Sequence, residues 1–205
     1  RERCGGQGYL SANRLGEAIN GAHAGMTAEG DNRVLMQKVA KELLSKANKS
    51  QIAKTMAVGY LPATARRLLN GTLAGNLESE VFQLRLFQIR ENHLLSELAI
   101  KLNNGKKAGK SLFETWMIEE SDLVQGLAQA YGHRVTLECI ISTTKRSARS
   151  LQPMLKLIRN LFAIDCIEQN LGWFVSQEVL TPNQGQKVPE ITRNICQQMA
   201  PHALS

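Results

Sequence analysis

The sequence predicts an all-α protein, built as a helical bundle. Along most of its 205 residues, apolar side chains recur at spacings of three and four, which places them on one face of a helix. The period-two alternation of a half-buried strand is nearly absent. Candidate N-caps and Gly-containing ends separate the apolar stripes. We therefore expect helices that pack through their apolar faces.

The first predicted helix begins at Asp31. Its carboxylate can accept hydrogen bonds from the first free backbone N–H groups and complements the helix dipole. The apolar face of this helix consists of Leu35, Met36, Val39, Ala40 and Leu43. Before it, residues 1–30 are rich in Gly and show little helical periodicity, so we expect an ordered Gly-rich segment or a fraying end.

Two helical regions follow. Residues 49–69 form a weaker one, interrupted near Gly59 and Pro62. A long helix is predicted over residues 78–103, and it ends at the Asn- and Gly-rich segment 101–110, interpreted as a solvated loop.

Three more helices complete the bundle. One is predicted over residues 121–144, with Ser121 as its cap, and another over residues 150–171, ended by Gly172. A turn region separates the latter from a last helix over residues 187–199.

Composition and charge narrow the class of protein. Hydrophobic residues make up 43% and charged residues 21%, as in an ordinary globular domain. The net charge is +7, but the basic residues are dispersed, and the densest groups fall in the short segments 101–110 and 145–149. Short blocks of this kind are usually loops or helix ends, so we expect no nucleic-acid partner. No apolar stretch approaches the length of a membrane span.

Cysteine and histidine spacing argues against a metal site. The four Cys contain no Cys-x-x-Cys pair, and the four His lack ligand spacing. We expect free thiols in a reducing compartment and no bound metal.

Two short motifs could carry chemistry. "CGGQGY" (residues 4–9) allows close backbone approach to a phosphate or a ring, although by spacing alone it is more typical of a tight turn. "TAEGDN" (residues 27–32) places Glu29 beside Gly at a helix entrance, where an isolated Glu is most often a capping or surface acid.

Taken together, in this order and separation, the two motifs resemble those of the acyl-CoA oxidases, the oxygen-using branch of the acyl-CoA dehydrogenase superfamily. Later segments are similar to the C-terminal helical domain of that family: "FETWMIEESDLVQGLAQAYGHRVTLE", "IEQNLGWFVSQEVLTP" and "ICQQMAPHAL". Two residues depart from the family pattern. Gln7 stands where His is usual, and Ala28 replaces the aromatic residue before the catalytic Glu.

The resemblance implies a mechanism and a set of site residues. Glu29 would be the general base that removes the α-proton of a fatty acyl-CoA while a hydride passes to FAD, which molecular oxygen then reoxidises to give hydrogen peroxide. The implied FAD-binding residues are Glu2, Cys4, Gly5, Gly6 and Asp31, and the implied substrate-binding residues are Gly30 and Asn32. Gly5 and Gly6 would approach the cofactor across a subunit boundary, which implies a homodimer.

The resemblance also implies a division of the chain. Residues 1–47 would end the flavin-site helical domain, and residues 48–205 would form the C-terminal helical domain. The chain begins inside a motif, without a start Met, so we expect a piece of a longer protein that also has N-terminal helices and a middle β-domain. A peroxisomal location is implied by the family alone, since no targeting tail closes the sequence.

Two alternatives remain open. An acyl-CoA dehydrogenase would pass its electrons to a carrier protein, although its motif more often reads Glu-Gly-Thr. A non-catalytic helical interaction module would bind no flavin.

Overall fold

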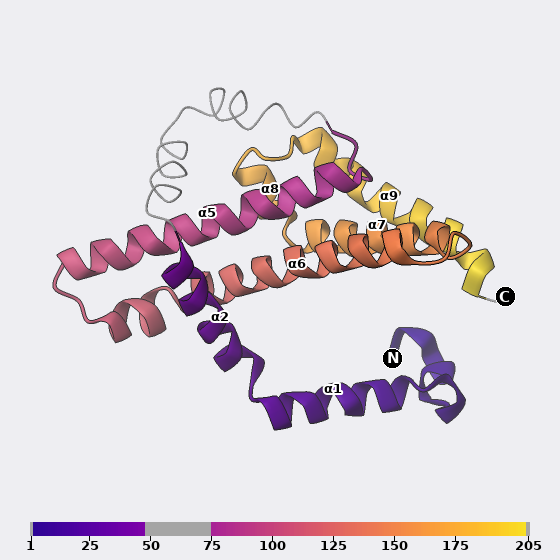
Figure 1. Ribbon diagram of the computed structural model, residues 1–205, viewed down its shortest axis with the longest axis horizontal. Coiled ribbons are helices and arrows are strands. Elements are labelled where there is room, and N and C mark those ends of the chain that lie inside the picture. The colour runs from indigo at the N-terminus through magenta and orange to yellow at the C-terminus, as the bar shows by residue number, and fades with distance from the viewer. Residues whose placement is uncertain (1, 48–74, 204–205) are drawn as a thin grey trace.

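The computed structural model describes residues 2–47 and 75–203. All regular structure in these two ranges is helical and neither contains a strand, which confirms the all-α prediction (Figure 1). The weak helix predicted over residues 49–69 lies outside the described residues. Within the described part of the chain, no helix is both long and apolar enough to cross a membrane.

In the described part of the chain, five helices after residue 75 form most of the bundle. The two longest, α5 (Glu80–Lys107) and α6 (Ser121–Arg146), run antiparallel and pack against each other (Figure 1). Helix α7 (Gln152–Gln169) returns along α6, and the short α8 (Leu171–Ser176) leads into α9 (Pro182–Met199), which packs on α7. The chain ends in a 3₁₀ turn, η4 (Ala200–Ala203).

The N-terminal segment is helical too. Two 3₁₀ segments, η1 (Glu2–Tyr9) and η2 (Ser11–Asn13), precede α1 (Leu15–Glu29) and α2 (Asn32–Lys46). The sequence predicted an ordered Gly-rich segment or a fraying end over residues 1–30, and it did not predict the helix α1 that the structure shows there. In the described structure α1 buries none of its residues and lies apart from the bundle, so no apolar stripe revealed it, and its glycines weaken a helix without forbidding one (Figure 1).

The bundle has two cores at its two ends. The larger, here called the C-terminal core, lies where α5, α6, α7, α8 and α9 meet; its fully buried members include Leu86, Leu137, Ile164, Ile167, Phe174, Val188 and Ile195. The smaller, here called the α2 core, joins α2 to the other ends of α5 and α6; its buried members are Ala40, Leu94, Leu98, Val124, Leu127 and Ala130. The apolar face that the sequence predicts for α2 thus packs into the α2 core, where Ala40 is its buried residue.

Helix α5 continues past its predicted end. Segment 101–110 is mostly helix and not a loop, because Gly105 is buried and packs against Thr115 of the π-helical turn η3 (Glu114–Glu119). The helix ends in a Schellman motif at Gly109, whose φ is 78°. There the N–H of Lys110 donates to the carbonyl of Gly105 (3.0 Å), and the N–H of Gly109 donates to that of Lys106 (3.1 Å).

Three other predicted helix ends shift. Ser121 is the first residue of α6 and does not cap it. Gly172 lies inside α8, because α7 already ends at Gln169, with Asn170 as its C-cap. Helix α9 begins five residues before its predicted start, at a capping box in which Thr181 Oγ1 accepts from the N–H of Gln184 (3.2 Å) and Gln184 Oε1 accepts from the N–H of Thr181 (2.9 Å).

Candidate functional site

The candidate base lies at the junction of two helices. Glu29 is the last residue of α1, Gly30 turns the chain, and Asp31 is the N-cap of α2. Gly30 has φ 105° and ψ 163°, a conformation that strains any residue with a side chain. Glu29 therefore ends one helix as well as preceding another, where the sequence predicted a helix entrance alone.

The two carboxylates at this junction have different surroundings. Asp31 Oδ1 accepts a hydrogen bond from the N–H of Arg33 (2.8 Å), which confirms the predicted cap. The Asp31 carbonyl accepts from the N–H groups of Val34 and Leu35 (3.0 Å each), which closes the first turn of α2. Glu29 is exposed in this chain, so its carboxylate is open to a ligand.

The Gly-rich turn forms a separate surface at the other end of α1. Gly5 has φ 55° and ψ −144°, which kinks η1. Among the described residues, no atom lies within 4 Å of a Cβ built at Gly5 or Gly6, so their backbone is open to close approach. Glu2 and Cys4 are exposed beside them.

Asn13 holds this turn in place, and the sequence reading missed it. Its Nδ2 donates to the Gln7 carbonyl (2.7 Å) and to Gln7 Oε1 (3.3 Å). Gln7, at the position where the family usually has His, thus takes part in the turn's own hydrogen bonding. No sequence pattern signalled the pair, because a lone Asn after a Gly-rich segment is typical of any turn.

A single chain does not bring the two motifs together. The Gly5–Gly6 turn and Glu29 lie at opposite ends of α1, and a helix of 15 residues is about 22 Å long (Figure 1). Gly30, Asp31 and Asn32 stay with Glu29.

An apolar groove of about 480 Å³ lies at the far end of α2, away from Glu29. It is lined by Lys41, Leu44, Leu102, Leu112, Phe113, Trp116 and Met117. The groove contains none of the predicted site residues.

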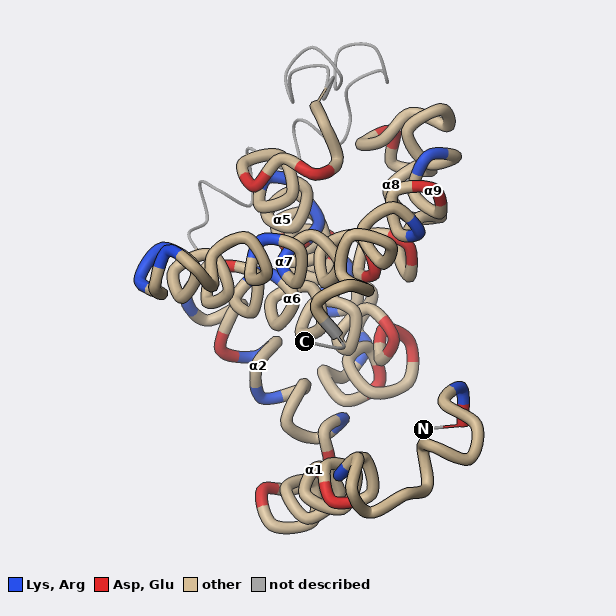
Figure 2. The backbone as a smooth tube through the Cα atoms, turned by 90° about the vertical axis from the view of Figure 1, so that its right-hand side faces the viewer, with Lys and Arg blue, Asp and Glu red and all other residues tan. Residues whose placement is uncertain are grey.

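Basic residues do not form a single surface. Figure 2 shows Lys and Arg spread over several helices and interspersed with Asp and Glu. Members of both basic groups are paired with carboxylates: Lys101 with Glu120 (2.9 Å) and Lys145 with Glu80 (3.0 Å). Within residues 2–47 and 75–203, no cluster of three or more His, Cys, Asp or Glu residues could hold a metal ion.

Comparison with known protein families identifies the family of this chain. Residues 81–205 match the family model of acyl-CoA oxidase, and residues 1–44 match that of the acyl-CoA oxidase C-alpha1 domain. The chain belongs to the acyl-CoA oxidase family. The two motifs that suggested this family lie in the second match, and the helical segments lie in the first.

Individual acyl-CoA oxidases agree with the family match. The chain is 31% identical to acyl-coenzyme A oxidase 2, peroxisomal, of Arabidopsis thaliana, with 94% of this chain and 29% of that protein covered. It is 28% identical to the acyl-coenzyme A oxidase-like protein of Mus musculus, with 100% of this chain and 33% of that protein covered. The chain thus spans about a third of the length of these relatives.

Solved acyl-CoA oxidase structures share the fold. Acyl-CoA oxidase 3 of Yarrowia lipolytica superposes with a TM-score of 0.75 at 20% identity, over 97% of this chain and 29% of that chain. Acyl-CoA oxidase 1 of Arabidopsis thaliana gives 0.70 at 23% identity, over 98% and 31% of the two chains.

Proposed function

We propose that this chain is the C-terminal part of an FAD-dependent acyl-CoA oxidase. The complete enzyme would convert a fatty acyl-CoA to its trans-2-enoyl-CoA and reduce oxygen to hydrogen peroxide, the first step of fatty acid β-oxidation. The chain belongs to the acyl-CoA oxidase family, and one observation in its structure carries the proposal: the carboxylate of Glu29 is exposed at the junction of α1 and α2.

The residues present fit a flavin nucleotide. The backbone at Gly5 and Gly6 is unobstructed by the described side chains, as close contact with a phosphate requires. Gly5 also has a positive φ, and a side chain there would be strained. Asn13 supports the turn through Gln7, so its shape is held before any ligand arrives. When bound, FAD would accept the hydride from the substrate β-carbon and be reoxidised by oxygen.

Glu29 would take the α-proton of the thioester. A carboxylate is the right acceptor, because the α-proton is weakly acidic and leaves only when a base stands within hydrogen-bonding reach. Gly30 sets the direction of the chain after Glu29, and the Asp31 cap anchors the start of α2. Both residues would thereby position the base.

The negative charge that develops on the thioester oxygen needs hydrogen-bond donors. Glu29 lies in the last turn of α1, where the N–H groups are bonded within the helix and the carbonyls are free. The resemblance to the acyl-CoA oxidases makes the backbone N–H of Glu29 the expected protein donor, and this N–H would have to leave its hydrogen bond within the helix to reach the thioester.

We further propose that the enzyme is a homodimer. The Gly5–Gly6 turn is a helix length away from Glu29 in the same chain, and α1 buries none of its residues in the described structure. Both observations support an arrangement in which the Gly5–Gly6 turn of one chain contacts the flavin bound at the active site of a second copy. Light scattering on the flavin-loaded protein should give a dimer, and an active flavin-loaded monomer would contradict the arrangement.

We propose a peroxisomal location, because the Arabidopsis relative carries that location in its name. Imaging of the full-length protein beside a peroxisomal marker tests this, and a diffuse distribution would refute it.

The experiment that tests the activity uses the purified full-length protein. Anaerobic fatty acyl-CoA should bleach the oxidised flavin absorbance, and mixing with oxygen in a stopped-flow instrument should restore it while releasing one peroxide per flavin. Slow reoxidation without peroxide would indicate a dehydrogenase that uses a carrier protein. A colourless protein would indicate a non-catalytic helical module.

A further inference from the structure

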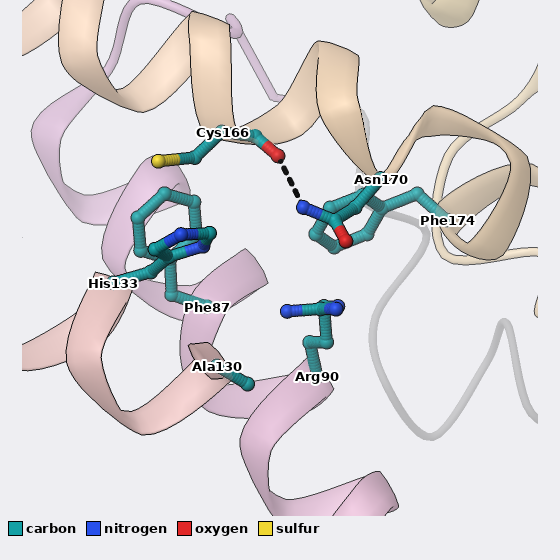
Figure 3. Close-up of a pocket in the computed structure, with 7 residues that line it drawn as sticks. All are labelled: Phe87, Arg90, Ala130, His133, Cys166, Asn170 and Phe174. Atoms are coloured by element: carbon teal, nitrogen blue, oxygen red, sulfur yellow. Dashed lines mark hydrogen bonds between the residues drawn. The ribbon is translucent and has the colours of Figure 1, made fainter. Parts of the chain in front are cut away.

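The cavity inside the bundle is too small to bind a ligand. It lies where α5, α6, α7 and α8 meet, and Figure 3 shows the guanidinium of Arg90 directed toward the space between the His133 ring and the Asn170 amide. Its volume of about 10 Å³ is at the lower limit for a single water molecule. The cavity therefore has no room for a group of a substrate or a cofactor.

The turn before α1, in contrast, is exposed and is closed by its own hydrogen bonds. The Gln7 carbonyl accepts from the N–H of Leu10 (3.3 Å) and from Asn13 Nδ2 (2.7 Å). The Leu10 carbonyl in turn accepts from the N–H of Asn13 (3.1 Å). Local hydrogen bonds therefore define the shape of residues 7–13.

The same bonds decide which way the Gln7 amide faces. A backbone carbonyl can only accept a hydrogen bond, so the Asn13 group that lies against it is the NH₂ group, Nδ2. That NH₂ group also lies 3.3 Å from the end of the Gln7 side chain, where it needs an acceptor. The Gln7 atom at this contact is therefore its oxygen, Oε1, and the NH₂ group of Gln7 faces away from Asn13.

The NH₂ group of Gln7 is available as a donor. Gln7 is exposed, and within residues 2–47 and 75–203 its Nε2 donates to no acceptor. It directly follows Gly5 and Gly6, whose backbone is open to close approach. An NH₂ group carries two hydrogens, and its hydrogen bonds to a charged phosphate oxygen are stronger than those to a neutral acceptor.

We propose that Gln7 binds FAD by donating from its Nε2 to the diphosphate, and that Asn13 is the positioning residue that orients this amide. The inference rests on the FAD-dependent function proposed above and adds a side-chain contact to the backbone contacts of Gly5 and Gly6. Because Asn13 orients the amide before FAD arrives, less conformational freedom is lost when FAD binds.

The first test measures FAD affinity in the full-length protein. The apo-protein is titrated with FAD, and the change in flavin fluorescence gives the Kd. Gln7→Met keeps the length of the side chain but removes its NH₂ group, so the Kd should rise by about 10-fold or more, as for a lost hydrogen bond to a charged group. Asn20→Ala, at an exposed position of α1, is the control and should retain the original Kd. Equally tight binding by Gln7→Met would overturn the proposal.

A double-mutant cycle separates orientation of the amide from plain support of the turn. In the unsubstituted protein, Asn13→Ala should raise the Kd of FAD both by freeing the backbone of the turn and by releasing the Gln7 amide. In the Gln7→Met background only the first effect remains, so the rise should be clearly smaller. Equal rises in both backgrounds would show that Asn13 does not act through the Gln7 amide.

A crystal structure of the FAD-loaded, unsubstituted protein needs no variant. Gln7 Nε2 within about 3.2 Å of a diphosphate oxygen supports the contact. A Gln7 side chain with no flavin atom in hydrogen-bonding reach overturns this inference alone, as does an unchanged Kd in Gln7→Met. An unsubstituted protein that binds no FAD overturns the proposed function as well.

Discussion

At the scale of single residues, the α1–α2 junction separates two carboxylates that stand two positions apart. Asp31 uses its side chain to cap α2, whereas Glu29 is exposed and available to a ligand. Helix capping therefore accounts for the position of Asp31 without any catalytic role. For Glu29 the proposed role as base makes a direct prediction.

Glu29→Gln in the full-length protein should retain flavin and bind acyl-CoA, because Gln preserves size and polarity. Flavin reduction by substrate should slow by about 10²–10⁴-fold, since a neutral amide cannot accept the α-proton. Anaerobic stopped-flow absorbance measures this step. Asp31→Asn is the matched control, as Asn is also a good N-cap, and its reduction rate should stay near that of the unsubstituted protein. Rapid flavin reduction in Glu29→Gln would place the base elsewhere.

Gly105 joins α5 to η3 by close packing. A Cβ at this position would lie 2.4 Å from Thr115 Oγ1 and 3.0 Å from its Cγ2, and Thr115 is buried. Gly105→Ala should therefore lower the free energy of unfolding by about 1–3 kcal/mol, the usual cost of overpacking. Chemical denaturation measures the change.

Gly126→Ala is the matched control for this substitution. It also lies inside a helix, α6, but no described atom lies within 4 Å of its Cβ position. Ala should stabilise the helix there by about 0.5–1 kcal/mol. Equal effects at the two glycines would rule out the packing explanation.

At the scale of elements, an ion cluster ties the start of α5 to α6 and α7. Glu80 pairs with Lys145 of α6 (3.0 Å) and with Arg159 of α7 (2.9 Å). Burial raises the pKa of Glu80, but the ion pairs with Lys145 and Arg159 outweigh it and hold this pKa below its ordinary value of 4.5. The cluster thus couples the packing of three helices to pH.

The sign of the pH effect follows from that lowered pKa. The stabilisation is fully present above pH 4.5 and is lost as the pH falls through the lower pKa of the folded state. Below pH 4.5, the thermal midpoint should fall more steeply for the unsubstituted protein than for Glu80→Gln, and the two should converge at the acid end. Glu190→Gln, at an exposed position of α9, should leave the acid limb unchanged. If the thermal midpoints of Glu80→Gln and of the unsubstituted protein fell equally steeply below pH 4.5, the role of the cluster would be contradicted.

At the scale of the whole molecule, the described chain divides into a packed bundle and a peripheral helix. Helix α2 contributes Ala40 to the α2 core, while α1 buries nothing in the described structure. Stability should therefore depend on α2 and hardly at all on α1.

Truncation tests this division. A chain of residues 31–205 should unfold at the same temperature as residues 1–205, because removing α1 exposes no core. A chain of residues 48–205 should unfold at a lower temperature, because the α2 core then loses Ala40 together with Leu43 and Leu44. Far-UV circular dichroism against temperature gives both midpoints. A lower midpoint for residues 31–205 would show that α1 supports the bundle.

The sequence by itself determined the helical class, the cap at Asp31 and the positions of Glu29 and the Gly-rich turn. These features depend on apolar periodicity and on residues a few positions apart, and both can be recognised in the sequence without knowledge of the tertiary structure. Two errors came from the limits of the same signals: helix α1 has no buried face and hence no apolar stripe, and α5 continues because Thr115 packs on Gly105. The start of α9 was a different kind of error, because its capping box is visible in the sequence and was overlooked.

Only the tertiary structure decided how these parts meet. It separated the Gly5–Gly6 turn from Glu29 by the length of α1. It also paired Arg134 with Glu91 and Arg159 with Glu80, while among the described residues the Nε of Arg90 has no hydrogen-bond partner. Each of these facts joins side chains from different helices. Their distances depend on how the bundle packs, and helix packing is set by the fit of whole faces, which no local pattern of residues specifies.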